Sequence, residues 1–137
     1  MTASTETAST GVDVVRAVFG AFASGDLAAL SDLLHADATW HHRNQDRHGG
    51  IHRGAEAIIA YLTESALLTA GTLRAVPQSV MADGQGHVAV PVQLSATRPD
   101  GRAMDGPQVV LVAVDSGRVR AVEQFVGDPV AVAAFWA

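Results

Sequence analysis

The sequence predicts an α+β domain, and three observations carry that prediction. The chain has 137 residues, which is room for one hydrophobic core and no second independent one. Helical periodicity is concentrated in the first half, while the second half shows the alternation and turn residues of strands. Helices and hairpins that are segregated along the chain argue against a doubly wound parallel sheet.

The first half begins with a polar segment over residues 1–11, which we expect to be a flexible tail. Apolar residues then recur at helical spacing from Val12 to Phe22, and Gly25 is a typical helix end. Asp26 is a candidate N-cap for a second, short helix, whose leucines extend to Leu34.

A short strand is expected over residues 37–42 after these helices. The polar segment 43–53 contains a Gly-Gly pair and is expected to be a loop. Apolar side chains at helical spacing then predict a third helix over residues 55–68.

An antiparallel meander is expected in the second half, with strands over 73–81, 87–98, 107–114 and 118–126. Pro91 lacks an amide hydrogen, so it predicts an edge strand or a bulge. Asp128 followed by Pro129 is a typical helix start, and an apolar helix is expected over 130–136.

Composition excludes several classes of chemistry. The chain has no cysteine, and its nine basic residues are all arginine, so thiol nucleophiles, Cys-ligated metals and lysine Schiff bases are absent. A formal net charge of −5 argues against nucleic-acid or polybasic membrane surfaces. With no secretion signal and no spanning segment, we expect a soluble, cytoplasmic protein.

Five short motifs occur in an order that resembles the nuclear transport factor 2-like fold, and within it the SnoaL-like branch. They are Phe19 to Leu27, Leu33 to Trp40, His52 to Ile58, Ala96 to Arg102, and Asp128 to Trp136. The resemblance covers residues 12–137 as one domain. It implies a cone, formed by a curved, mostly antiparallel sheet that three helices wrap around a small-molecule cavity.

The resemblance also implies a choice of functions. Similar proteins include polyketide cyclases, ketosteroid isomerases and limonene-epoxide hydrolases, and others are non-catalytic binding or dimerisation modules. Proteins of this fold often pair through the sheet, so a homodimer is expected, without a cofactor. Epoxide hydrolysis ranks lowest because the sequence shows no Asp–Arg–Asp arrangement.

The family positions decide which residues are candidates for catalysis. Matching the isomerases places His42 where their general base lies, and Val18 and Val110 where their two oxyanion donors lie, which argues against steroid-type isomerisation. Matching the cyclases places Gln124 in their acidic position. A register slip of one residue would turn Glu123 inward instead.

Four histidines between positions 41 and 52 are the most unusual feature of the sequence. Neighbours on a strand face opposite sides, so only one of His41 and His42 enters a cavity, and we favour His42 with Trp40 on its face. Histidine titrates near neutral pH and suits enolisation of a 1,3-dicarbonyl or deprotonation of a phenol. One alternative is that these histidines are solvated loop residues. A metal site is a second, less favoured alternative, because the spacing of the histidines matches no familiar zinc pattern.

The predicted catalytic residues are therefore His42 and Gln124. The predicted substrate-binding residues, which would form the cavity wall or bind a polar group, are Trp40, Phe19, Tyr61, Arg98 and Glu123. For Arg98 the alternative is a solvated surface role. We expect a SnoaL-like cyclase or isomerase of secondary metabolism that acts on a polyketide-like or other hydrophobic small molecule. A non-catalytic binding or dimerisation module is the alternative.

Overall fold

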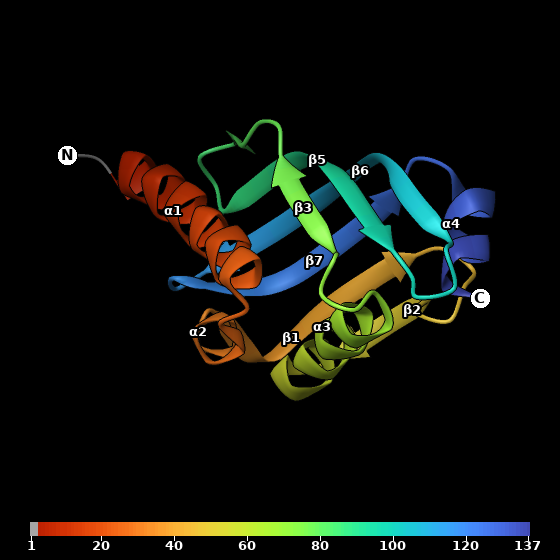
Figure 1. The fold of residues 1–137 in the computed structure, drawn as a ribbon. Coiled ribbons are helices and arrows are strands. Elements are labelled where there is room, and N and C mark those ends of the chain that lie inside the picture. Colours follow the sequence, from red (N-terminus) through yellow and green to blue (C-terminus); the bar gives the residue numbers. More distant parts are fainter. Residues whose placement is uncertain (1–2) are drawn as a thin grey trace.

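A curved, mixed sheet organises the protein, as Figure 1 shows for the computed structural model, which describes residues 3–137. The helices are α1 (Ala3–Ser24), α2 (Leu27–Asp32), α3 (Ala55–Leu68) and α4 (Pro129–Trp136). The strands are β1 (Leu34–Arg43), β2 (Gly50–Arg53), β3 (Arg74–Pro77), β4 (Met81–Ala82), β5 (His87–Thr97), β6 (Ala103–Asp115) and β7 (Arg118–Val126). No helix among these is long and apolar enough to cross a membrane.

The strand order is β2-β1-β7-β6-β5-β3, and β4 pairs with β5 beside β3. Every neighbouring pair is antiparallel except β1 and β7, which run parallel and bring His42 opposite Gln124. The sheet therefore joins the first strand of the chain to its last one, with two predicted catalytic positions side by side.

The main core lies between one face of this sheet and the helices α1, α2 and α3 (Figure 1). Alternate residues of β5, namely Val88, Val90 and Val92, are buried there, while their neighbours along the strand are more exposed. A smaller apolar cluster, in which Phe135 and Trp136 are buried, anchors α4 against the other end of the sheet. The α+β prediction and the cone-like architecture are confirmed.

Several element boundaries differ from the prediction. Helix α1 begins at Ala3, so residues assigned to a tail belong to a helix. Strand β1 begins at Leu34, which the leucine pattern had assigned to the preceding helix. Strand β2 (Gly50–Arg53) lies inside the predicted loop. The segment is short, largely exposed and without apolar alternation, so only its pairing with β1 makes it a strand.

Pro91 lies inside the sheet rather than in an edge strand, because β5 has partners on both sides. Its carbonyl accepts a hydrogen bond from the amide of Gln78 (2.8 Å), in the interval between β3 and β4. The N–H and C=O groups of a strand residue point to the same side of the strand. The side on which Pro91 lacks an N–H therefore faces the gap between β3 and β4, where β5 has no paired strand residue to hydrogen-bond.

Candidate active site

The position of His42 follows from the alternation of β1. His42 is 1% exposed and lies on the helix-covered face of the sheet. Its neighbour His41 lies on the outer face, where its Nδ1 is 3.0 Å from a carboxylate oxygen of Glu123. The prediction that only one of the two histidines enters the interior is confirmed.

Asp46 returns to His42 through a tight loop that follows β1. Gly49 closes this loop, because a Cβ at this position would lie 2.1 Å from the carbonyl oxygen of Asn44. Only glycine allows the backbone to approach this closely. The amide of Gly49 donates to the carbonyl of Asp46 (2.9 Å), so the loop holds its own shape.

The Asp46 side chain is 0% exposed, and its Oδ2 lies 2.9 Å from His42 Nε2. The amide of Asn44 donates to the same oxygen (2.8 Å), and the backbone N–H of His48 donates to Oδ1 (2.8 Å). Burial alone raises the pKa of the Asp46 carboxyl, but the hydrogen bonds from His42, Asn44 and His48 outweigh it and lower the pKa. Asp46 is therefore a buried carboxylate.

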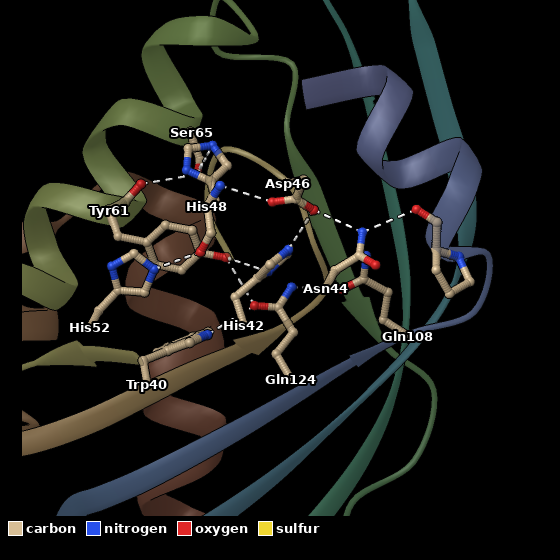
Figure 2. Close-up of polar contacts among 11 residues, drawn as sticks. Trp40, His42, Asn44, Asp46, His48, His52, Tyr61, Ser65, Gln108 and Gln124 are labelled. Carbon is tan, nitrogen blue, oxygen red and sulfur yellow. Dashed lines mark hydrogen bonds and ion pairs between the residues drawn. The ribbon is translucent and has the colours of Figure 1, made fainter. Parts of the chain in front are cut away.

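A chain of hydrogen bonds extends from His42 across the site (Figure 2). The hydroxyl of Tyr61 is 3.3 Å from His42 Nδ1 and donates to Gln124 Oε1 at 2.9 Å. Trp40 Nε1 donates to the same oxygen at 2.9 Å, and Gln124 Nε2 donates to Gln108 Oε1 at 2.7 Å. The orientation of the Gln124 amide is thereby fixed on both of its ends.

These contacts determine which nitrogen of His42 is basic. An ionised carboxylate only accepts hydrogen bonds, so Nε2 carries the hydrogen that Asp46 receives. In neutral His42 the lone pair is then on Nδ1, on the side of Tyr61. Burial and the negative charge of Asp46 raise the pKa of Tyr61, against the effect of the Gln124 contact, so its hydroxyl stays protonated.

An apolar cavity of about 90 Å³ opens beside this network. His42, Trp40, Tyr61, Gln108 and Gln124 supply polar groups to its wall. Most of the remaining wall is apolar, and it includes the side chains of Phe19, Phe22, Leu30, Val92, Val112 and Val122. An enclosed apolar space with a few convergent polar groups has the general character of a small-molecule site.

The structure brings five of the seven predicted site residues to this cavity, namely His42, Gln124, Trp40, Phe19 and Tyr61. Gln124 faces the interior and Glu123 the outer face, where Glu123 pairs with His41 and Arg43. Val18 and Val110 also line the cavity.

Arg98 does not reach the cavity. Its guanidinium donates to the carbonyls of Phe135 and Ala137 (both 3.1 Å), at the end of α4. Four C-terminal carbonyls of a helix lack partners inside the helix, so this contact is a structural cap. Arg98, which was expected to bind substrate, therefore binds the end of α4 instead. Glu123, which was also expected to bind substrate, contacts His41 and Arg43 on the outer face.

Sequence reasoning gave no catalytic role to Asp46, Gln108 or His48. For Asp46 the sequence offered no signal, because the loop that turns it toward His42 shows no periodic pattern. His48 is buried, with its ring centroid 4.5 Å from that of Trp136, and burial lowers its pKa from 6.5 to about 4. His52 stacks on Tyr61 with ring centroids 4.3 Å apart.

The histidine-rich segment therefore surrounds Tyr61 instead of a metal ion. Within residues 3–137, no group of three or more His, Asp or Glu side chains is placed to hold a metal. His42, His48 and His52 all have rings within 6.1 Å of the Tyr61 ring, measured between centroids.

Comparison with known proteins gives consistent results. The family model for the SnoaL-like domain matches residues 15–122. An uncharacterised protein of Mycobacterium tuberculosis is 32% identical over 126 residues, which cover 92% of this chain and 95% of the relative. Bal32a, from a soil-derived mobile gene cassette, has a solved structure with a TM-score of 0.92 at 30% identity, covering 96% of this chain and 99% of Bal32a.

A third similarity is to a Xanthomonas campestris protein of unknown function with a cystatin-like fold. The TM-score is 0.86 at 25% identity, over 93% of this chain and 98% of that one. These relatives share the fold over nearly their whole length.

Proposed function

Because the chain belongs to the SnoaL-like family and carries a buried histidine–aspartate pair beside an apolar cavity, we propose that it is an enzyme of the cyclase or isomerase type. The substrate is a polyketide-like or other hydrophobic small molecule of secondary metabolism, and the reaction uses His42 without a cofactor. The place of action is the cytoplasm.

The single observation that carries this proposal is the contact between the side chains of His42 and Asp46, both at most 1% exposed. Burying two ionisable groups is costly unless they are paired, and buried ionisable groups beside a cavity are candidates for a functional site. Here His42 lines the cavity, and its Nδ1 atom lies 3.3 Å from the hydroxyl of Tyr61.

The first step is proton abstraction from a carbon next to a carbonyl, or from a phenol. The substrate C–H or O–H bond breaks, its electron pair moves to the carbonyl or phenolate oxygen, and Nδ1 of His42 gains the proton. Asp46 stabilises the imidazolium that forms. The amide of Gln124 donates one N–H to Gln108, and its second N–H is a donor within the site that stabilises a developing oxyanion.

The second step distinguishes the two reaction types. In an isomerisation, His42 returns the proton to a different atom of the enolate. In a cyclisation, the enolate carbon attacks a second carbonyl carbon, a C–C bond forms, and the resulting alkoxide takes the proton from His42. Neither route needs an oxidant, a reductant or a metal ion.

The alternative function is a non-catalytic binding module, and one observation favours it. Gln124 stands where the cyclases of the family carry an acid, and an amide takes no proton at physiological pH. A ligand that binds tightly and leaves unchanged would support this alternative.

Hydrogen–deuterium exchange tests the proposal directly. The purified protein is incubated in deuterium oxide with cyclic ketones and 1,3-diketones of one to three rings, and exchange at the acidic carbon is followed by NMR. We expect catalysed exchange that falls by about 10²–10⁴-fold in His42→Ala. His87→Ala, a surface histidine, is the matched control. Exchange that His42→Ala retains would reject His42 as the base.

We also propose that two copies pair through the outer face of the sheet. Three large apolar side chains are exposed on this face, Val109, Leu111 and Phe125. These side chains lie on β6 and β7, which are central strands of the sheet. A patch of this kind on a single chain is typical of an interaction surface.

A further inference from the structure

The cavity beside His42 is small for the substrates that the proposed function implies. Its volume is about 90 Å³, whereas pockets for drug-sized ligands measure roughly 300–1,000 Å³. An engineered protein cavity of roughly 150 Å³ takes up benzene, so this one is smaller than a space for one aromatic ring. A substrate with more than a few heavy atoms must extend beyond the cavity.

A second hollow lies next to the cavity, between α1 and the segment from β3 to β4. This outer groove has a volume of about 400 Å³. Phe19 of α1 and Ala75 of β3 line both spaces, so these two residues form the partition between them. Helix α1 lies across the sheet beside β3 in Figure 1.

The outer groove differs from the cavity in its polarity. Arg16 and Ser79 line it, and among residues 11–137, whose side chains the structure describes, neither side chain has a hydrogen-bond or ion-pair partner. The groove thus offers a guanidinium and a hydroxyl to a ligand, in a chain whose net charge is −5. A guanidinium binds carboxylate, phenolate and sulfonate groups well.

We propose that the cavity and the outer groove form one two-part ligand site, with Phe19 at the neck. The reacting end of the ligand lies at His42 and Gln124, and its distal end passes Phe19 and presents an anionic group to Arg16. This inference rests on the proposed function for the identity of the reacting end. It narrows the substrate to an elongated amphiphile with an acidic C–H or O–H at its apolar end.

Two fluorescent probes of nearly equal shape test this arrangement. 8-Anilinonaphthalene-1-sulfonate carries an anionic group, and N-phenyl-1-naphthylamine is the same skeleton without it. Fluorescence titration gives the Kd of each probe for the full-length protein. Arg16→Gln should weaken binding of the sulfonate about fivefold and leave the neutral probe unchanged, because only the charged contact is lost. Arg53→Gln, at an exposed position outside both spaces, is the matched control.

Gly20 allows the groove to be filled without disturbing the fold. It lines the groove in the middle of α1, and a Cβ at this position would meet no heavy atom within 4 Å. Gly20→Trp should weaken both probes at least tenfold, and tryptophan has a higher helix propensity than glycine. Ala17→Trp, exposed on the same helix but outside the groove, should weaken neither probe.

The proposal is overturned if Gly20→Trp leaves both affinities unchanged, or if Arg16→Gln weakens the two probes equally. These results concern binding, so they are independent of turnover. Loss of probe binding in Gly20→Trp, together with no catalysed exchange by the wild type, would reject the proposed function and keep the two-part site.

Discussion

Asp46 and His42 form a buried pair four residues apart, with Oδ2 and Nε2 separated by 2.9 Å. The same chain contains a second Asp–His pair at the same spacing, Asp83 and His87, with 2.7 Å between the atoms. That pair is 46% and 71% exposed. Sequence spacing and distance are nearly equal in the two pairs, but the first is buried beside a cavity and uses Nε2 of its histidine, whereas the second is exposed and uses Nδ1.

Replacing Asp46 by Asn should inactivate the site without removing its base. An amide donates hydrogen to the imidazole as readily as it accepts, so the His42 tautomer with a free Nδ1 lone pair is no longer imposed. We expect catalysed exchange to fall by about 10²–10⁴-fold, as for other positioned general bases. Nitrogen-15 NMR of the His42 ring should show the altered tautomer.

Asp83→Asn is the control for this experiment, because it alters an exposed Asp–His pair of the same sequence spacing. Its exchange rate should equal that of the wild type. An Asp46→Asn protein that keeps both the wild-type tautomer and the wild-type rate would show that Asp46 does not position His42.

Acid should destabilise the protein through His48. Burial lowers its pKa from 6.5 to about 4, so between these pH values the unfolded chain binds more protons than the folded one. The free energy of unfolding therefore falls as the pH falls from 6.5 to about 4, by up to about 3 kcal/mol from this group. Asp46, with its lowered pKa, adds a loss only at lower pH.

His48→Phe keeps a ring next to Trp136 and removes the titrating group. Urea unfolding at pH 7 and pH 4.5 should show a smaller decrease in stability for this variant than for the wild type. His87→Phe, at an exposed site, should retain the wild-type decrease. Equal decreases in all three proteins would contradict the assignment to His48.

Arg98→Ala should lower stability and leave ligand binding intact. The side chain donates to two carbonyls at the end of α4. A hydrogen bond from a charged group contributes roughly 1.5–3 kcal/mol to the free energy of unfolding. Because Arg102 bonds the same carbonyls, we expect a loss of about 1 kcal/mol in the free energy of unfolding. The Kd for N-phenyl-1-naphthylamine should stay at the wild-type value, and a large increase would restore a binding role for Arg98.

Leu111→Arg should convert the proposed dimer to a monomer. The new side chain lies opposite Glu123 on the neighbouring strand, so it is accommodated within one chain. In a symmetric interface, however, two such charges would be buried close together. Sedimentation velocity measures the change in mass, and Val130→Arg, at an exposed site on α4, is the control. A wild-type protein that sediments as a monomer would remove the proposal.

The parts of the fold that depend on local sequence were predictable. Asp26 and Asp128 cap their helices as expected, each accepting from a backbone N–H three residues ahead. The last strand has the predicted bounds, because its alternation is regular and turn residues flank it. The inward position of His42 followed from strand alternation together with the family resemblance.

The remaining parts of the site depend on contacts that no local pattern encodes. The choice between Glu123 and Gln124 rests on how β7 is aligned with β1, where the register shifts between Leu34 and Thr39. The place of Asp46 rests on a loop in which Gly49 approaches the carbonyl of Asn44. In sequence this loop has the composition of a solvated segment, so its inward carboxylate gives no signal.

The parallel pairing of β1 with β7 has a consequence for how the protein is made. His42 and Gln124 face each other across this pair, yet 81 residues lie between them in the chain. A nascent chain on the ribosome holds the histidine long before the glutamine exists, so the site stays incomplete until β7 has been synthesised. Pairing across so long an interval also slows folding. A chain that stops before β7 should therefore neither bind nor transform a ligand.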